Sequence, residues 1–392
     1  MKILYFSPHP HINLAAPSGP GTHMREVIAA FEEEGHKVVR FIQGGEQLHA
    51  TDKKIDFKKR SWKKFVPALV WETLRDLQMI RLDKKIEARL INFIEQEKPD
   101  LIYERSCYGM GSGMRAAEKK RIRYVVEMNA PYPEEKSLMQ GKSMLQHLGN
   151  SHEKKQVLSA YRTVVVSSAM KNYLIEKTQV SPDKILVVAN AVNPSHIHFN
   201  ETRQAQIRLD YGFTQAHTVF GFVGSIFPYH GVDIMIESFA TLEKEYSDAR
   251  MLIVGDGEIL PQLKSRVEQL KLNSKVHFTG NVPHAEVYDY LSVMDVTVMA
   301  RSNWYGSPVK IFEYGAMQKA IIAPRVIPVT DVMENEIDGL LIEAQEKDLT
   351  NSMGFMLNNP SDRQRMALTF HSKVMREHTW KQVANQILNS CQ

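Results

Sequence analysis

The chain repeats one local pattern along its length: a short apolar run, a polar or glycine-containing loop, and a stretch with helical spacing. Near the N-terminus, residues 3–6 form such a run, and four apolar residues from Met24 to Phe31 then fall at i, i+3, i+4 and i+7. Residues 38–42 form the next run. Short strands that alternate with amphipathic helices predict βαβ units. The predicted fold class is therefore α/β, with doubly wound parallel sheets.

The pattern occurs in both halves, which predicts two domains of like architecture. A chain of 392 residues is long enough for two or three domains. We predict a Rossmann-like domain over residues 1–192 and a second over 217–375. Turn-forming and polar residues predict a linker over 193–216. A last helix, over 376–392, is expected to return to the first domain.

Composition excludes several classes of protein. The two cysteines, Cys107 and Cys391, are too few for a disulfide framework or a metal cluster. The N-terminal apolar run breaks at Ser7-Pro8, which is short of a signal-peptide core, and no run is long enough to span a bilayer. We therefore expect a cytoplasmic protein.

The net charge of +4 is concentrated in one segment. Residues 51–65 hold seven basic and two acidic side chains, a charge of +5, so the rest of the chain sums to −1. Aromatic residues lie among the lysines. Residues 53–71 suit either a solvated helical face or a peripheral contact with an anionic membrane surface. No nucleic-acid partner is expected, because no stacking or groove-reading motif accompanies the charge.

Glycines and polar residues follow the expected strands of the first half. Gly19-Pro-Gly21-Thr-His23 comes after the first strand, where glycines would let the backbone approach a phosphate. Met24 stands where a dinucleotide fingerprint has its third glycine, so no redox cofactor is expected. Arg105 and Asn129 follow later strands, and each suits a loop or capping role as well as a ligand contact.

Residues 306–323 predict a loop, a helix and a strand. Pro308 suits the first turn of the helix, with Ser307 as its N-cap. Lys310 and Glu313 lie three residues apart and would be neighbours on one face. A carboxylate and an ammonium near a helix start could hold a ligand with hydroxyls and phosphates, such as a sugar nucleotide. Such residues are also common for structural reasons, because an acidic side chain there favours the helix dipole.

Taken together, these motifs resemble those of the GT-B glycosyltransferases, in the large retaining class called glycosyltransferase family 4, or glycosyltransferase group 1. In the second half the resemblance rests on residues 222–233, 254–257, 278–284 and 307–315, which come in the family's order. In the first half it rests on the Gly-Thr-His loop and on residues 103–106, 127–131 and 190–193. These match a branch that builds bacterial polysaccharides and glycoconjugates. The resemblance implies two Rossmann-like domains facing across a cleft.

The resemblance also implies a donor site in the second domain, where Glu313 would bind the ribose and backbone near Val282 the base. Ser225 and His230 stand where the family usually has an arginine and a lysine for the diphosphate, and Tyr305 stands at the first of its paired glutamates. Phosphate binding would then depend on the helix start. The expected donor-site residues are Gly19, Gly21, Ser225, Gly257, Val282, Arg301, Ser307, Pro308, Val309, Lys310 and Glu313.

By the same resemblance, the first domain would bind a sugar or lipid-linked acceptor. The expected acceptor-site residues are His23, Arg105, Asn129 and Glu134, with Asn129 at the place of a frequent active-site histidine. The expected catalytic residues are Lys310, Glu313, Asn129 and His230.

The activity implied is transfer of a sugar, with retention, from a nucleotide-diphosphate sugar to an acceptor hydroxyl. Charge stabilisation at the leaving diphosphate would carry the catalysis, with no cofactor and no metal. Two alternatives remain open: a sugar-nucleotide 2-epimerase of the same architecture, and an inactive partner subunit that binds nucleotide sugar.

Overall fold

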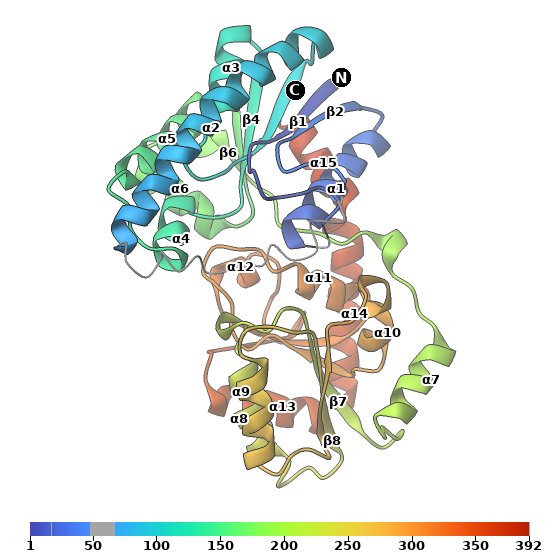
Figure 1. The fold of residues 1–392 in the computed structure, drawn as a ribbon. Helices are drawn as coiled ribbons and strands as arrows, with labels where there is room; N and C mark the ends of the chain where they lie inside the picture. The colour runs from blue at the N-terminus through green and yellow to red at the C-terminus, as the bar shows by residue number, and fades with distance from the viewer. Residues whose placement is uncertain (17, 48–66, 392) are drawn as a thin grey trace. The chain divides into compact units, whose positions relative to one another are not determined.

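The structure, a computed structural model, describes residues 1–16, 18–47 and 67–391 (Figure 1). The chain divides into two compact units, one formed by Met1–Val188 with Trp380–Gln392 and the other by Ala189–Thr379. Each unit is built on one six-stranded sheet whose neighbouring strands are all parallel. The predicted α/β class, with two doubly wound sheets, is confirmed.

The N-terminal unit has the strand order β2-β1-β3-β4-β5-β6. Its strands are β1 (Lys2–Ser7), β2 (Lys37–Ile42), β3 (Leu101–Arg105), β4 (Arg123–Met128), β5 (Arg162–Val165) and β6 (Ile185–Val187). Its helices are α1 (Gly19–Glu33), α2 (Ala68–Glu97), α3 (Ser112–Lys120), α4 (Tyr132–Met139), α5 (Gln146–Ser159), α6 (Ser168–Thr178) and α15 (Trp380–Asn389). Residues 3–6 of β1 are fully buried, as expected for a central parallel strand covered on both faces.

Helix α15 belongs to this unit although it lies at the far end of the chain. It packs against α1. The guanidinium of Arg162 holds the end of the chain by donating to the Ser390 carbonyl at 3.0 Å. Ring contact between His23 and Trp380, with centroids 5.0 Å apart, adds to the same packing.

The C-terminal unit has the strand order β12-β11-β10-β7-β8-β9. Its strands are β7 (Thr218–Val223), β8 (Ala249–Val254), β9 (Val276–Gly280), β10 (Val296–Val298), β11 (Ala320–Pro324) and β12 (Leu340–Ile342). Its helices are α7 (Glu201–Asp210), α8 (Val232–Leu242), α9 (Leu260–Gln269), α10 (Val287–Ser292), α11 (Val309–Ala316), α12 (Ile327–Thr330), α13 (Glu346–Asn358) and α14 (Pro360–Glu377).

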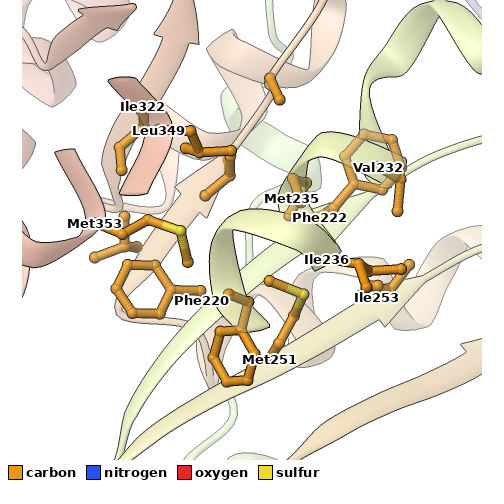
Figure 2. Close-up of a cluster of buried hydrophobic side chains, with 14 of the residues drawn as sticks. Phe220, Phe222, Val232, Met235, Ile236, Met251, Ile253, Ile322, Leu349 and Met353 are labelled. Atoms are coloured by element: carbon orange, nitrogen blue, oxygen red, sulfur yellow. The ribbon is translucent and has the colours of Figure 1, made fainter. Parts of the chain in front are cut away.

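One face of this second sheet packs on α8 and α13 to form a fully buried apolar core (Figure 2). Phe220 and Phe222 point to the same face because side chains alternate along a strand. Met235 and Ile236 of α8 and Met353 of α13 cover them. This core fixes the strand from which the first loop of the candidate site leaves.

Several local expectations differ from the structure. Residues 193–216, predicted as a linker, lie within the second unit, where α7 buries Ile207 and packs on α10. Ser307 is not the N-cap of α11: Pro308 occupies that position, and the Ser307 hydroxyl accepts a hydrogen bond from Asn190 N–H instead. Gly19 to His23, expected as part of the loop after the first strand, instead form the first residues of α1, which Ser18 caps.

The predicted basic segment, residues 53–71, lies mostly outside the described residues, which resume at residue 67. Among the described helices, none has an apolar stretch of the length that a bilayer crossing requires.

Candidate active site

In the C-terminal unit, the loops that follow β7 and β10 meet at the carboxyl edge of the sheet. Strand β7 lies between β8 and β10. From β7 the strand order runs one way to β8 and β9 and the other way from β10 to β11 and β12, so it reverses between β7 and β10. In doubly wound sheets, ligands bind beyond the carboxyl ends of the strands at such a point. Arg301, after β10, donates from Nη1 to the Pro228 carbonyl at 3.0 Å and so ties the two loops together.

Two glycines let the loop after β8 lie directly against the loop after β7. A Cβ at Gly255 would come within 2.0 Å of the Gly224 carbonyl oxygen, and one at Gly257 within 2.2 Å of the Ile226 carbonyl oxygen. The Ile226 N–H donates to Asp256 O at 2.9 Å. Gly257, expected at the donor site, therefore has a structural reason to be glycine.

Lys310, in the first turn of α11, points its amine into this loop cluster. Its Nζ is covered and has no hydrogen-bond partner among the described residues. The amine lies 4.3 Å from the centroid of the Phe222 ring, and a Cβ on Gly224 would be 3.1 Å from it. Burial lowers the pKa of Lys310 to about 7, although Glu313 opposes that shift. Burial likewise raises the pKa of Glu313, against the influence of Lys310.

His230 is held as a neutral imidazole with a defined tautomer. Its Nδ1 lies 2.6 Å from the Ser225 carbonyl oxygen, which can only accept, so Nδ1 carries the proton. Burial first, and then the charge of Lys310, lowers the pKa of His230 to about 4. Its Nε2 is thereby left with a lone pair.

The start of α11 is fixed from three sides. Asn190 donates from its backbone to Ser307 Oγ at 3.0 Å and from Nδ2 to Ser307 O at 2.7 Å. Asn303 Oδ1 accepts from the Gly306 N–H at 2.6 Å. Within the helix, the Tyr314 hydroxyl accepts from the Val223 N–H at 3.0 Å and so binds α11 to β7. Val309 follows Pro308 as the first residue of α11.

The other predicted donor residues lie in different places. Val282 follows β9 and packs, partly buried, against a second apolar cluster of this unit, which includes Val254 and Tyr288. Gly19 and Gly21 belong to the first turn of α1 in the N-terminal unit. A Cβ on Gly21 would meet the Ala16 carbonyl oxygen at 2.5 Å, so close backbone packing explains this glycine.

In the N-terminal unit, three predicted acceptor residues converge on a fourth residue, Glu127, that we did not select from the sequence. Its buried carboxylate lies 2.8 Å from His23 Nε2 and 2.8 Å from Arg105 Nη1, and it also accepts from Asn129 Nδ2. The Tyr103 hydroxyl donates to it at 2.6 Å.

These partners keep Glu127 ionised. Burial alone would raise its pKa, but His23 and then Arg105 hold it well below the ordinary value. The side-chain amide of Asn129 donates from its NH₂ group to Glu127, and this hydrogen bond fixes the orientation of the amide carbonyl oxygen. A carboxylate this well satisfied is a fixed support for the side chains around it.

His9 is a second residue that we did not select. It follows β1, next to the point where the strand order reverses between β1 and β3. Burial, together with the nearby His11 and Arg105, lowers its pKa to about 4.

Glu134 does not join the Glu127 group: its carboxylate pairs with Lys177 of α6 at 3.0 Å and accepts from the Tyr173 hydroxyl. The signal that could have found Glu127 is its place in the 127–131 motif, on which the family resemblance partly rests.

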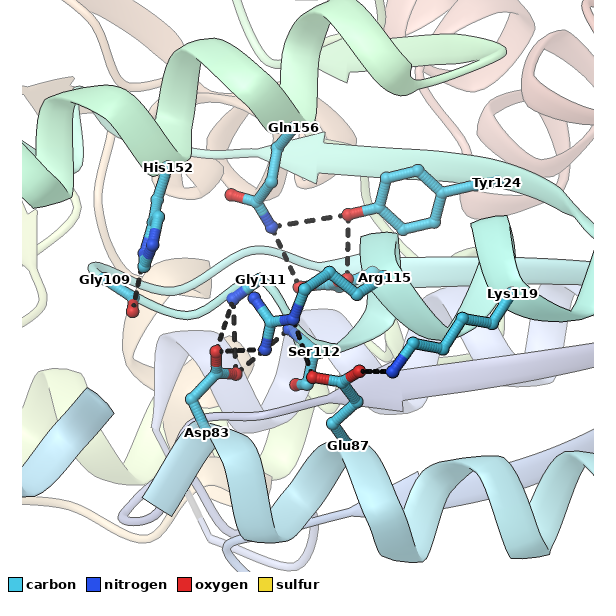
Figure 3. Close-up of polar contacts among 11 residues, drawn as sticks. Asp83, Glu87, Gly109, Gly111, Ser112, Arg115, Lys119, Tyr124, His152 and Gln156 are labelled. Carbon is cyan, nitrogen blue, oxygen red and sulfur yellow. Dashed lines mark hydrogen bonds and ion pairs between the residues drawn. The ribbon is translucent and has the colours of Figure 1, made fainter. Parts of the chain in front are cut away.

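A further polar network in this unit is structural (Figure 3). Asp83 of α2 accepts from the backbone N–H groups of Gly111 and Ser112 and so caps α3. Arg115 pairs with Asp83 at 2.7 Å and with Glu87 at 2.6 Å. Lys119 also pairs with Glu87 at 2.7 Å, so two bases compensate two acids and we assign the network no ligand.

Comparisons with known proteins agree with this fold. Over 100% of this chain and 99% of the other, it is similar to Anabaena Alr3699/HepE in complex with UDP, with a TM-score of 0.72 at 15% identity. It is similar to sucrose-phosphate synthase from Thermosynechococcus elongatus, with a TM-score of 0.74 at 15% identity over 99% and 98% of the two chains. The protein therefore has the GT-B fold, as predicted.

Two family profiles together match most of the chain. Residues 17–196 match the family described as Glycosyltransferase Family 4, and residues 204–369 match the one described as Glycosyl transferases group 1. The chain belongs to the GT-B glycosyltransferases of the family 4 type.

Curated relatives match part of the chain. The chain is 23% identical over 225 residues to the phosphatidylinositol N-acetylglucosaminyltransferase GPI3 subunit of Saccharomyces cerevisiae, covering 57% of this chain and 49% of that protein. It is 24% identical over 217 residues to alpha-D-kanosaminyltransferase of Streptomyces kanamyceticus, covering 55% and 56%. The chain thus spans about half the length of the curated relatives it matches.

Proposed function

We propose that the protein transfers a sugar from a nucleotide-diphosphate sugar to an acceptor hydroxyl, in the synthesis of a polysaccharide or glycoconjugate. The observation that carries this proposal is the covered amine of Lys310 at the carboxyl edge of the second sheet, which has no hydrogen-bond partner in the part of the chain that the structure describes. A buried polar group without a partner is costly and calls for an explanation. A diphosphate would supply the negatively charged oxygens that this amine lacks.

The surrounding residues suit the rest of such a donor. We assign Glu313 to the ribose hydroxyls, the start of α11 to the phosphates, and the backbone near Val282 to the base. A uridine nucleotide is the first one to test, because the similar fold of Alr3699/HepE has been determined with UDP and with UDP-glucose.

The proposed transfer proceeds with retention and without a divalent metal. The diphosphate would raise the pKa of Lys310, which would then hold its proton and stabilise the charge that develops on the leaving group. His230 Nε2 and Arg301 are the further groups proposed to contact phosphate oxygens. The leaving diphosphate itself would accept the proton of the acceptor hydroxyl.

The acceptor is assigned to the group around Glu127. His23, Arg105 and Asn129 would contact it, with Asn129 presenting a fixed carbonyl oxygen. We further propose a cytoplasmic location, with residues 53–71 in contact with an anionic membrane surface that carries a lipid-linked acceptor.

Release of nucleoside diphosphate tests the proposed reaction. The protein is incubated with UDP-glucose and related nucleotide sugars, with and without a glycolipid fraction, in buffer containing EDTA. We expect release that depends on the added acceptor and persists in EDTA. Conversion to an epimeric nucleotide sugar without release would instead identify an epimerase, and activity restored only by Mg²⁺ would contradict the metal-free mechanism.

A further inference from the structure

The first turns of α2 have an inverted amphipathic pattern. The acids Glu72 and Asp76 face inward and are buried, whereas Leu69, Leu74 and Leu77 face solvent. Asp83 is buried as well, where it caps α3, and after it the buried residues of the helix are the apolar Ile86, Leu90 and Ile94. An exposed leucine on its own needs no explanation, but an inversion confined to one end of a helix does.

A partner for the buried acids comes from α4. The Lys136 ammonium is itself buried, lies 2.8 Å from Asp76 Oδ1, and sits over the Tyr108 ring at 4.9 Å from its centroid. This ion pair docks α4 against the start of α2, and the two helices lie side by side in Figure 1. Arg75 also pairs with Glu72 at 3.5 Å, so the two inward-facing acids have two bases as partners.

The segment that follows α4 extends the apolar surface. Leu138, Met139 and Met144 are 84%, 75% and 66% exposed. Met144 N–H donates to Thr73 Oγ1 of α2 at 3.1 Å, so this segment meets the helix in the turns that carry the exposed leucines. We call Leu69, Leu74, Leu77, Leu138, Met139 and Met144 the apolar rim.

The charges around the apolar rim favour a bilayer as its occupant. Lys142 is exposed beside it, and Arg75 is exposed as well and pairs with Glu72 at 3.5 Å, whereas the acids of the same turns are buried. Apolar side chains flanked by bases are typical of surfaces that lie in the headgroup region of anionic membranes. The rim is also near the proposed acceptor residues, since α4 begins three residues after Asn129.

We propose that the apolar rim inserts into the interface of an anionic bilayer. This proposal rests on the membrane contact proposed above, because that contact identifies a bilayer as the partner of the rim. It does not require residues 53–66 to bind the membrane, or the protein to transfer a sugar. Insertion places side chains among acyl chains, which an electrostatic contact alone does not do.

A fluorophore on the rim tests insertion directly. Both native cysteines are buried, so NBD can be attached selectively to a Leu138→Cys variant. Leu209→Cys, at a position 74% exposed on α7, is the matched control. With phosphatidylcholine vesicles containing phosphatidylglycerol, we expect a blue shift and a gain in NBD emission for the Leu138 label and no change for the Leu209 label.

Vesicle sedimentation of unlabelled variants separates the possible failures. We expect Leu138→Ser with Met139→Ser and Met144→Ser to weaken binding about tenfold or more, and Leu209→Ser to leave it unchanged. Vesicle binding by the wild type with neither a blue shift nor an effect of the triple variant would overturn insertion and leave the membrane contact standing. No vesicle binding by the wild type would overturn both, and light scattering that showed a rim-dependent dimer would assign the rim to a second copy instead.

Discussion

Among the single residues of the candidate site, Lys310 is unfavourable to bury in the free protein. Its amine is covered, unpartnered within the described part of the chain, and shifted to a pKa of about 7 by burial. Lys319 is a contrasting lysine of the same unit: burial lowers its pKa to about 8, but its Nζ donates to the Ser292 carbonyl at 2.9 Å. The two lysines share burial and differ in having a partner.

Replacement of Lys310 by methionine should stabilise the free protein and impair donor binding. Removing an unpaired buried polar group is expected to contribute about 1 kcal/mol or more, equivalent to about 2 to 4 °C in Tm per kcal/mol for a domain of this size. Differential scanning fluorimetry with and without UDP-glucose measures both effects. Lys319→Met is the control, and it should lower Tm while ligand stabilisation is kept.

The pKa of Lys310 also predicts how binding varies with pH. Below pH 7 the amine is charged in the free protein, so affinity for UDP should be constant. Above pH 7 the amine must first take up a proton, so the Kd should rise by about tenfold per pH unit. Titration calorimetry from pH 6 to 9 tests this, and Lys310→Arg, which stays protonated, should flatten the profile.

The same shift has the opposite sign for stability. Because the folded pKa lies below the ordinary 10.5, the unfolded chain binds more protons between pH 7 and 10.5. The contribution of Lys310 to the free energy of unfolding therefore improves as pH rises through that window. Wild type and Lys310→Met should approach each other in Tm toward alkaline pH.

Glu313 has two possible roles that differ in magnitude. A carboxylate near a helix start contributes about 0.3 to 1 kcal/mol to stability, whereas hydrogen bonds from ribose hydroxyls would contribute about 1.5 to 3 kcal/mol each to a complex. Glu313→Ala should leave Tm nearly unchanged and weaken UDP binding by about tenfold to a few hundredfold. An unchanged Kd in calorimetry would return Glu313 to a structural role.

At the scale of elements, the loops after β7 and β8 form one rigid support. Gly257→Ala would place a methyl group against the Ile226 carbonyl, and we expect a loss of about 1 to 3 kcal/mol in stability with weaker donor binding. Gly354→Ala is the control, because its Cβ would have no neighbour nearer than 3.7 Å and its helix would gain propensity. Equal effects of the two substitutions on UDP binding would show that the loop contact does not shape the site.

Local sequence patterns predicted helices and strands better than they predicted which residues contact one another. The helix of residues 309–316 follows from Pro308 and its apolar spacing, but Ser307 binds Asn190, which is 117 residues away, and no local rule gives that pairing. In the same way, His23, Arg105 and Asn129 were identifiable as polar groups after strands, whereas their convergence on Glu127 depends on the strand order. Capping and pairing across a sheet are decided by tertiary contacts.

At the scale of the whole molecule, the repeated strand and helix pattern was enough to predict two doubly wound units. The boundary between the units was harder to predict. Residues 193–216 are mostly polar, as a linker would be, but they include α7, which buries Ile207 in the second unit. The strand β12 was not predicted either, since a run of three apolar residues carries little periodicity.

We propose that the second unit binds a nucleotide-diphosphate sugar through Lys310. Calorimetric titration of the wild type and Lys310→Met with UDP-glucose and a panel of other nucleotide sugars at pH 6.5 tests this proposal. We expect saturable binding of one nucleotide by the wild type and binding at least about tenfold weaker in the variant. In a second titration at pH 8, binding by the wild type should take up protons and binding by the variant should not. Equal affinity of the two proteins for that nucleotide, or no binding of any nucleotide sugar by the wild type, would contradict it.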